Sequence, residues 1–485
     1  MKNFIINLVI ILSTYTILYS QVPESGRVVE SIIVKGLKSG TTKITIHYNQ
    51  DMLRESIYYE KPDTNGIYQP SSKYLYEYNE FGKFTLFQNM VFTGGEWVLY
   101  EKRIAEYNLS GNEIRSISMN IFGNMVDLDT ISMRETTYDE FGNIIERIDK
   151  FKVYGGGMQN SKRNTFEYTA SNKVKSQSIY KWENNAWVNY GLIHKSYNEY
   201  DSLICDSTFM WKENDWVNSM LYIYGYDDAR NLSLLEIYIN EDNQWIKMEQ
   251  YRYGYDEKRR RVETIKSMRV HDEWVENSGR VTVEYRSDGQ IANEKGYNLE
   301  NSEWKVVAVT EYKYNGDNKN TEILYKILVE DVWTNNYRYI YEYSNDNILQ
   351  NLKYQVWKDN DWQKSDNLLI FRDKYNEYTY NNCYELNLQW LPLSVEELQV
   401  LSQISLYPNP ASDYIGINGL YQTLGNGIEK VQIFNTLGIE VGQSSLTGDN
   451  SQVTMQDLLK INISQLPAGV YFVKVGGTVI KFVKI

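Results

Sequence analysis

Residues 333 to 343 read Trp-Thr-Asn-Asn-Tyr-Arg-Tyr-Ile-Tyr-Glu-Tyr, the clearest copy of a pattern that runs through most of the chain. Trp333 shares one parity with Tyr337, Tyr339, Tyr341 and Tyr343, and mainly polar residues take the other parity. Strict alternation of this kind predicts a β-strand with one aromatic face and one mainly polar face.

Two aromatic series repeat this pattern with one period. Tryptophan recurs at intervals of 29 or 30 residues at Trp187, Trp216, Trp245, Trp274, Trp304, Trp333 and Trp362. Upstream, Trp97 keeps the phase, and Tyr68, Leu128 and Met158 occupy the tryptophan position. Tyrosine recurs at intervals of 29 to 31 at Tyr48, Tyr78, Tyr107, Tyr138, Tyr168, Tyr197, Tyr226, Tyr255, Tyr285, Tyr314 and Tyr343. Two series in one phase indicate a tandem repeat.

Each repeat predicts a β-hairpin. Asn, Asp and Gly cluster after the second-series tyrosine, as in the stretch from Tyr285 to Gln290, and these residues favour turns. Tryptophan and tyrosine are 10 residues apart in nearly every unit, which would place both on one face of the strand. The unit that starts at Trp274 has one residue more, so we expect a β-bulge near Gly279.

The repeats predict an all-β fold. About eleven hairpins over residues 21–383 would supply about 22 strands of an antiparallel meander. Because sheets beyond about ten strands curl or split, we expect a curled or spiral sheet with the aromatic series inside. A β-propeller is the alternative. The unit after Trp362 is degenerate, since Tyr375 and Tyr378 miss the phase, as expected of a cap.

The turn sequence resembles the Tyr-Asp (YD, RHS-like) repeats of bacterial surface and secreted proteins. The shared motif is clearest from Tyr138 through Asp139 and Gly142 to Asn143, and next clearest from Tyr78 to Lys83. The resemblance implies a shell built from hairpins. It departs from the family in its longer period and in the many copies that lack the glycine.

The composition excludes several classes of function. A net charge of -13 argues against nucleic acid as a partner. Three histidines and two cysteines are too few for a Cys/His zinc site or a disulfide framework, so we expect no metal, no cofactor, and free thiols at Cys205 and Cys383. The Asn/Asp-rich turns at 315–318 and 345–347 could hold Ca²⁺, although turn formation alone explains them.

The first twenty residues have the layout of a secretory signal peptide. A positive start at Lys2 precedes an apolar run from Phe4 to Leu18, and cleavage is expected between Ser20 and Gln21. We find no further segment that could span a membrane. The sequence therefore predicts an exported chain.

Composition changes near residue 384. Residues 384–403 read as a linker, and residues 404–485 as short alternating strands of a small β-sandwich. Four motifs stand in this last segment. They are Tyr407-Pro408-Asn409-Pro410, Phe434-Asn435 followed by Gly438, Leu466 with Ala468, Gly469 and Tyr471, and a basic end with Lys481 and Lys484.

These four motifs resemble the type A C-terminal sorting domain of the type IX secretion system. The resemblance implies a periplasmic intermediate, passage through the outer-membrane secretion machinery, and removal of the domain by a sortase-like peptidase. Cleavage is then expected between about Leu391 and Ile404. The protein would be secreted or held at the outer cell surface.

Two functions remain open for the repeat region. A long array suits a structural or adhesive surface that binds a glycan or a protein. The alternative is a secreted hydrolase that acts on polysaccharide, with an unrecognised site in an irregular unit such as the one at Gly155-Gly156-Gly157. No catalytic motif such as Gly-x-Ser-x-Gly occurs, and we expect no enzyme.

Overall fold

The computed structural model describes residues 27–79, 82–121, 128–153, 156–373, 376–392, 405–407, 411–418, 431–435, 440–444, 459–475 and 478–484. All regular elements in these ranges are β-strands. Strands β1 to β23, together with β27, belong to one antiparallel sheet. One shorter strand, one hairpin and two small sheets complete the regular elements of the described chain.

The large sheet uses the following strands: β1 (Arg27–Gly36), β2 (Gly40–Tyr48), β3 (Arg54–Pro62), β4 (Tyr68–Tyr78), β5 (Phe84–Thr93), β6 (Glu96–Tyr107), β7 (Glu113–Ile121), β8 (Leu128–Tyr138), β9 (Ile144–Lys152), β10 (Met158–Tyr168), β11 (Val174–Glu183), β12 (Ala186–Tyr197), β13 (Leu203–Lys212), β14 (Asp215–Tyr226), β15 (Leu232–Glu241), β16 (Gln244–Tyr255), β17 (Arg261–Val270), β18 (Glu273–Tyr285), β19 (Ile291–Glu300), β20 (Glu303–Tyr314), β21 (Asn320–Val329), β22 (Val332–Tyr343), β23 (Leu349–Lys358) and β27 (Glu385–Pro392). Each of β1 to β23 pairs with its neighbours in sequence, and β27 pairs with both β1 and β23.

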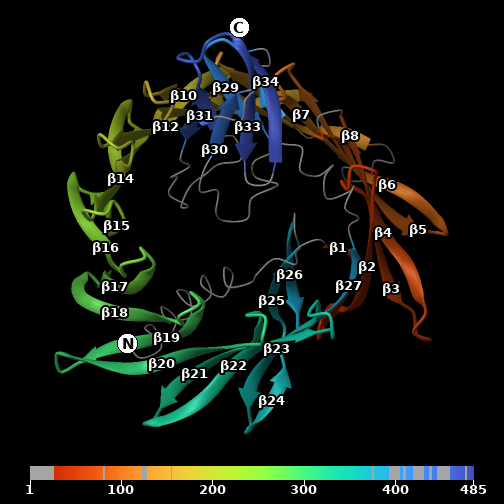
Figure 1. The fold of residues 1–485 in the computed structure, drawn as a ribbon, viewed down its shortest axis with the longest axis vertical. Helices are drawn as coiled ribbons and strands as arrows, with labels where there is room; N and C mark the ends of the chain where they lie inside the picture. Colours follow the sequence, from red (N-terminus) through yellow and green to blue (C-terminus); the bar gives the residue numbers. More distant parts are fainter. Residues whose placement is uncertain are drawn as a thin grey trace.

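The sheet is a closed barrel of 24 strands, which corrects the expected curled or spiral sheet and the propeller alternative (Figure 1). The eleven expected hairpins, each with its turn after a second-series tyrosine, are the pairs β2–β3 to β22–β23, and β27 closes the ring between β23 and β1. The odd strand and the even strand after it, such as β13 and β14, form a hairpin as well, and from here on we use the word for these pairs. Closure removes the two free edges that an open sheet would leave. Strand β27 occupies the start of the segment expected as a linker and carries neither aromatic series.

Two chain segments adjoin this closure. Strand β24 (Asp361–Lys364) pairs with the outer end of β23, beyond the three residues that pair with β27. Strands β25 (Asn367–Arg372) and β26 (Glu377–Cys383) form a separate hairpin that lies inside the ring (Figure 1). The degenerate last unit therefore packs against the closure.

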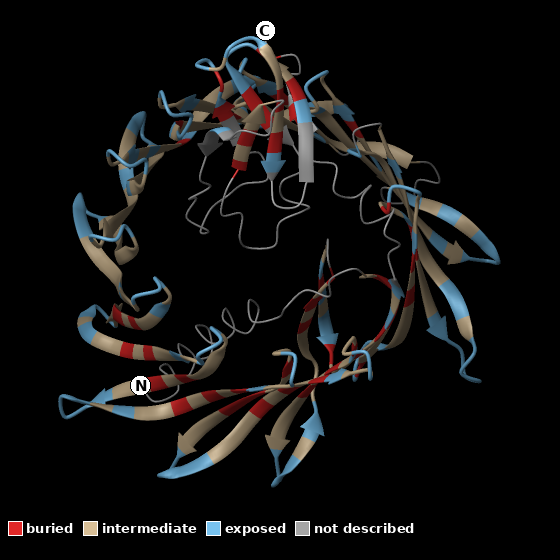
Figure 2. Ribbon diagram, viewed as in Figure 1, coloured by how far each residue is buried: buried red, intermediate tan, exposed pale blue. Residues whose placement is uncertain are grey.

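The face of the barrel that packs against this hairpin is the inner face. Leu369, Phe371 and Cys383 of the hairpin are fully buried in one cluster with Tyr325 and Tyr339 of the wall. Within the large sheet, Figure 2 shows buried residues concentrated in β19 to β23 and beside the hairpin. Cys205 and Cys383 are both free thiols.

A one-residue bulge in nine of the repeats corrects the expectation that tryptophan and tyrosine share a face. In β22, Asn336 has no partner between the pairs Tyr325–Tyr337 and Lys326–Asn335. The extra residue reverses the alternation, so Trp333 lies on the outer face and Tyr337 on the inner face. Equivalent bulges stand three residues after the tryptophan position at Ser71, Tyr100, Ile131, Ser161, Tyr190, Ser219, Met248 and Val307. The unit with the extra residue is also irregular just before Gly279, where a bulge was expected.

The C-terminal residues form two small sheets around their own core. One sheet contains β28 (Ser405–Tyr407), β29 (Tyr414–Asn418) and β32 (Leu459–Asn462). The other contains β30 (Val431–Asn435), β31 (Glu440–Ser444), β33 (Gly469–Val475) and β34 (Thr478–Lys484). One buried cluster joins Ile415 and Ile461 of the first sheet to Ile433, Val473 and Phe482 of the second.

Candidate functional site

Where they are described, the expected sorting motifs lie on the two C-terminal sheets and in the turn between β32 and β33. Tyr407 ends β28, and Phe434 and Asn435 end β30 opposite Phe472 and Tyr471 of β33. Leu466 packs against the buried cluster, Ala468 is exposed, and Gly469 begins β33. Lys481 is exposed and Lys484 half-buried on β34. Pro408, Asn409, Pro410 and Gly438, and the signal-cleavage residues Ser20 and Gln21, lie outside the described residues.

Tyr471 holds its motif together. Its side chain is buried, and its ring stacks on Phe482 of β34 with a centroid separation of 5.5 Å. Its hydroxyl donates a hydrogen bond of 2.9 Å to the carbonyl oxygen of Pro467. The motif that runs from Leu466 to Tyr471 is therefore a turn that leads into β33, and Tyr471 holds the turn to the strand by packing and by its hydrogen bond.

In the barrel, the second-series tyrosines close one end of each hairpin. Tyr226, at the end of β14, donates a hydrogen bond of 2.8 Å from its hydroxyl to the carbonyl oxygen of Leu203, the first residue of β13. All eleven make the equivalent bond, at 2.6 to 3.1 Å. We call this edge of the barrel the tyrosine rim. Burial raises the pKa of Tyr107 and of Tyr314 from 10.0 to about 12, so these hydroxyls stay protonated donors.

The opposite end of the hairpins carries tight turns. In eight hairpins a two-residue turn has positive φ at both positions, as at Asn184 (50°) and Asn185 (61°), which is the type I′ geometry of β-hairpins. A tryptophan stands two residues after each of these turns, at Trp97, Trp187, Trp216, Trp245, Trp274, Trp304, Trp333 and Trp362. Three of them meet a second tryptophan across the hairpin, as in the T-shaped pair Trp211–Trp216 at 5.0 Å. We call this edge the tryptophan rim.

The tryptophan rim is strongly acidic. Its eight turns with one flanking residue on each side are residues 93–96, 183–186, 212–215, 241–244, 270–273, 300–303, 329–332 and 358–361. They contain fourteen Asp and Glu residues against Lys212 and Lys358, and all of these charged residues are exposed. Among these fourteen, only Glu300 forms an ion pair in the described chain, with Lys305 at 2.8 Å.

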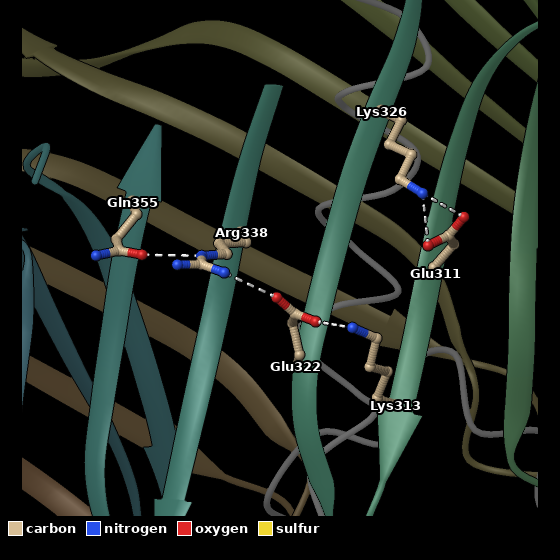
Figure 3. A network of polar contacts seen from close by, with 6 residues as sticks. All are labelled: Glu311, Lys313, Glu322, Lys326, Arg338 and Gln355. Atoms are coloured by element: carbon tan, nitrogen blue, oxygen red, sulfur yellow. Dashed lines mark hydrogen bonds and ion pairs between the residues drawn. The ribbon is translucent and has the colours of Figure 1, made fainter. Parts of the chain in front are cut away.

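The outer wall between the two rims differs from the tryptophan rim, because many of its charges form ion pairs. Figure 3 shows one such network across β20 to β23. Lys326 bonds both carboxylate oxygens of Glu311 at 2.8 and 2.9 Å. Glu322 contacts Lys313 and accepts a bond of 3.2 Å from Arg338, whose Nε donates to Gln355 at 2.8 Å. Along β20 to β23 the charges of the wall are therefore joined in ion pairs.

A buried polar cluster stands where the ring closes. The Arg54 guanidinium lies 4.8 Å from the centroid of the Tyr378 ring, and the Tyr378 hydroxyl donates to Asp373 at 2.8 Å. Burial raises the pKa of Tyr378, and the charge of Asp373 raises it further. For Arg54, burial acts against the charge, but Tyr378, Tyr48 and Asp373 raise its pKa overall. Sequence reasoning missed this cluster, because Arg54 and Tyr378 are far apart in the chain.

Among the described residues no group of three or more His, Cys, Asp and Glu side chains could hold a metal ion. In the turn at 315–318, the Asn315 side-chain oxygen accepts the backbone N–H groups of Asp317 and Lys319, at 3.1 and 3.0 Å. Its amide nitrogen donates to Asn347 of the next turn at 2.6 Å. These side chains therefore build the turns. The described part of the chain contains no helix with the length and apolarity needed to cross a membrane.

Comparison with known proteins gives one family match. Residues 405–484 match the secretion system C-terminal sorting domain. No curated protein matches the chain.

Several solved structures are similar at low identity. A protein of unknown function from Bacteroides fragilis is 20% identical over 24% of this chain and 89% of its own, with a TM-score of 0.22. The Photorhabdus luminescens Tc holotoxin pore is 11% identical over 83% of this chain and 22% of its own, with a TM-score of 0.33. A porin-like protein from Bacteroides uniformis is 10% identical over 75% of this chain and 98% of its own, with a TM-score of 0.19. These TM-scores are too low to assign a fold or an activity.

The motif order and the family match agree on the same residues. Residues 405–484 are a secretion system C-terminal sorting domain, which indicates export by type IX secretion to the outer surface or the medium.

Proposed function

We propose that this protein is delivered to the cell surface or the medium, where its barrel serves as a structural and adhesive body that binds a glycan or a protein. The observation that carries the proposal is the sorting domain at residues 405–484, which follows a barrel already closed at Pro392. The two parts have separate buried clusters. Removal of the sorting domain would therefore leave the barrel's core whole.

The repeated rims support a binding role. Repeat arrays offer extended surfaces on which one local feature recurs many times. Here the tryptophan rim repeats an outward indole beside carboxylates of which one, Glu300, forms an ion pair, whereas many charges of the wall between the rims are paired. Nothing among the described residues favours the hydrolase alternative.

The processing of the chain follows from the same reading. We expect cleavage before Gln21 during export and removal of the sorting domain by a sortase-like peptidase between about Leu391 and Ile404. Cells that express the full chain should be fractionated, and the surface and medium forms sequenced from both ends. A form that begins at Gln21 and ends between Leu391 and Ile404 is the expected result.

A matched control is the same chain truncated after Pro392, which keeps the barrel and should remain in the periplasm. A surface form that retains Ile485, or a truncated chain exported as well as the full chain, would refute the proposed route. Adhesion is measured separately, by binding of the purified protein to glycan arrays and to cells.

A further inference from the structure

We propose that the tryptophan rim binds a cationic glycan, an extended polymer that contains free amino sugars. The inference rests on the proposed binding role of the barrel and names the partner and the place. Sugar rings would stack on the outward indoles, and their ammonium groups would pair with the rim carboxylates.

The tryptophans are available for stacking. Trp333 is 46% exposed and Trp245 37% exposed, large values for indoles in a barrel wall. Both lie on the outer face, because the bulge after each reverses the alternation. Indole faces are good platforms for apolar sugar faces and for cations.

The spacing fits an extended polymer. Neighbouring tryptophans of the row stand two strands apart, which is roughly 10 Å at about 4.8 Å per strand. That spacing is close to one disaccharide unit of an extended, β-linked glycan. A chain laid along the rim would therefore bring an equivalent ring face to Trp245 and Trp333, whose indoles are exposed. The two tryptophans between them are half-buried, and Lys247 lies 5.6 Å from the Trp274 centroid and Arg280 5.8 Å from that of Trp304.

The charge of the rim selects among glycans. Thirteen of its fourteen carboxylates have no ion-pair partner in the described chain, whereas Lys and Glu pair along the wall. The protein already shows cations on these indoles, since the Lys73 ammonium lies 4.6 Å from the Trp97 centroid and the Arg338 guanidinium 4.2 Å from that of Trp362. Trp245 and Trp333 carry no such cation among the described residues. The rim carboxylates would repel a polymer of uronic acids or sulfated sugars, and they would attract a polymer of free amino sugars.

The test uses the purified full-length chain and measures binding by calorimetry. The ligands are three β-linked hexasaccharides: the hexamer of glucosamine, the hexamer of N-acetylglucosamine, and the hexamer of glucose (cellohexaose). The glucosamine hexamer should bind at least about tenfold more tightly than the other two, and added salt should weaken it. Trp333→Ala with Trp245→Ala, and separately Glu330→Gln with Asp331→Asn, should each lower its affinity by about tenfold or more. Circular dichroism checks that each variant is folded.

The matched control is Tyr200→Ala, which removes a 52% exposed aromatic side chain from the tyrosine rim and should leave binding unchanged. Failure of the glucosamine hexamer to bind, or binding that survives loss of both tryptophans, would overturn the inference. Equal binding of oligolysine, insensitive to the tryptophan variants, would overturn it in favour of a purely electrostatic surface. Tryptophan-dependent binding of the neutral hexamers would overturn the amino-sugar assignment but would still agree with the proposed adhesive role. The adhesive role itself fails only if the protein binds neither glycans nor cells.

Discussion

A single hydroxyl explains why one aromatic series consists of tyrosine and not phenylalanine. The first carbonyl of each odd strand from β3 to β21 stands at the open end of its hairpin, and the tyrosine hydroxyl of the next strand supplies its donor, as Tyr226 does for Leu203. In β1 the acceptor is Val29. A half-buried carbonyl without a donor costs about as much as a lost hydrogen bond. The series is thus a set of eleven clamps along the tyrosine rim.

Replacement of Tyr226 with Phe should therefore lower stability by about 1 kcal/mol, because the ring still packs but the Leu203 carbonyl loses its partner. The measurement is the urea midpoint of unfolding. Tyr200→Phe is the control, since that side chain is 52% exposed and should tolerate the loss of its hydroxyl. Equal midpoints for the two variants would show that the hydroxyl clamp contributes nothing.

At the scale of the element, the loops of the tyrosine rim share one backbone conformation whatever their sequence. The fourth loop residue has positive φ in every described copy, as Gly142 (83°), Asn172 (59°) and Arg259 (61°) do. In each loop its N–H donates to the carbonyl of the first loop residue, as Arg259 does to Asp256 at 2.9 Å. The glycine of the Tyr-Asp turn motif suits the positive φ at this position. Other residues can replace it, because the hydrogen bonds hold the loop in the same conformation.

Arg259→Gly should accordingly raise stability, by up to about 1 kcal/mol, because a side chain in the left-handed region is strained. Gly142→Ala, the reverse change at the same loop position, should lower it by a similar amount. Thermal unfolding of both variants beside Lys258→Gly, an exposed neighbour without positive φ, gives the comparison. If Arg259→Gly lowers the unfolding temperature as much as Lys258→Gly does, the backbone strain at residue 259 is negligible.

For the whole molecule, the sequence predicts the repeat but not its closure. The period, the strand content and the sorting motifs follow from residues that recur or cluster, such as Trp333 and Tyr407. The bulges cannot be read from the sequence, because the even spacing of 10 residues between tryptophan and tyrosine conceals one unpaired residue. The turns before the tryptophans do carry a signal, since their Asn, Asp and Glu residues are typical of type I′ turns. Closure depends on β27, which has no marker, and on pairing between strands hundreds of residues apart, which local pattern cannot reveal.

Strand β27 closes the ring through two unequal ladders. It pairs with β1 over eight residues and with β23 over only three, Asn387, Leu386 and Glu385. Side chains reinforce the junction, since Lys35 and Glu385 form an ion pair at 3.0 Å and Leu386 is fully buried. The short ladder with β23 is therefore the place where the barrel should open first.

Leu386→Asp buries a charge in this junction and should release β27 while the hairpins on the far side of the ring stay folded, because repeats contact mainly their neighbours. Hydrogen exchange in the full-length chain should then accelerate for the amides of β1 and β23 and stay unchanged in β11 to β16. Leu391→Asp is the control within the same strand, since Leu391 is 36% exposed and can keep an added carboxylate in water. Faster exchange all around the ring would mean that closure stabilises every hairpin together, and unchanged exchange in β1 would mean that the ring does not depend on β27. Either result would show that the junction between β27 and β23 is not the weak point of the barrel.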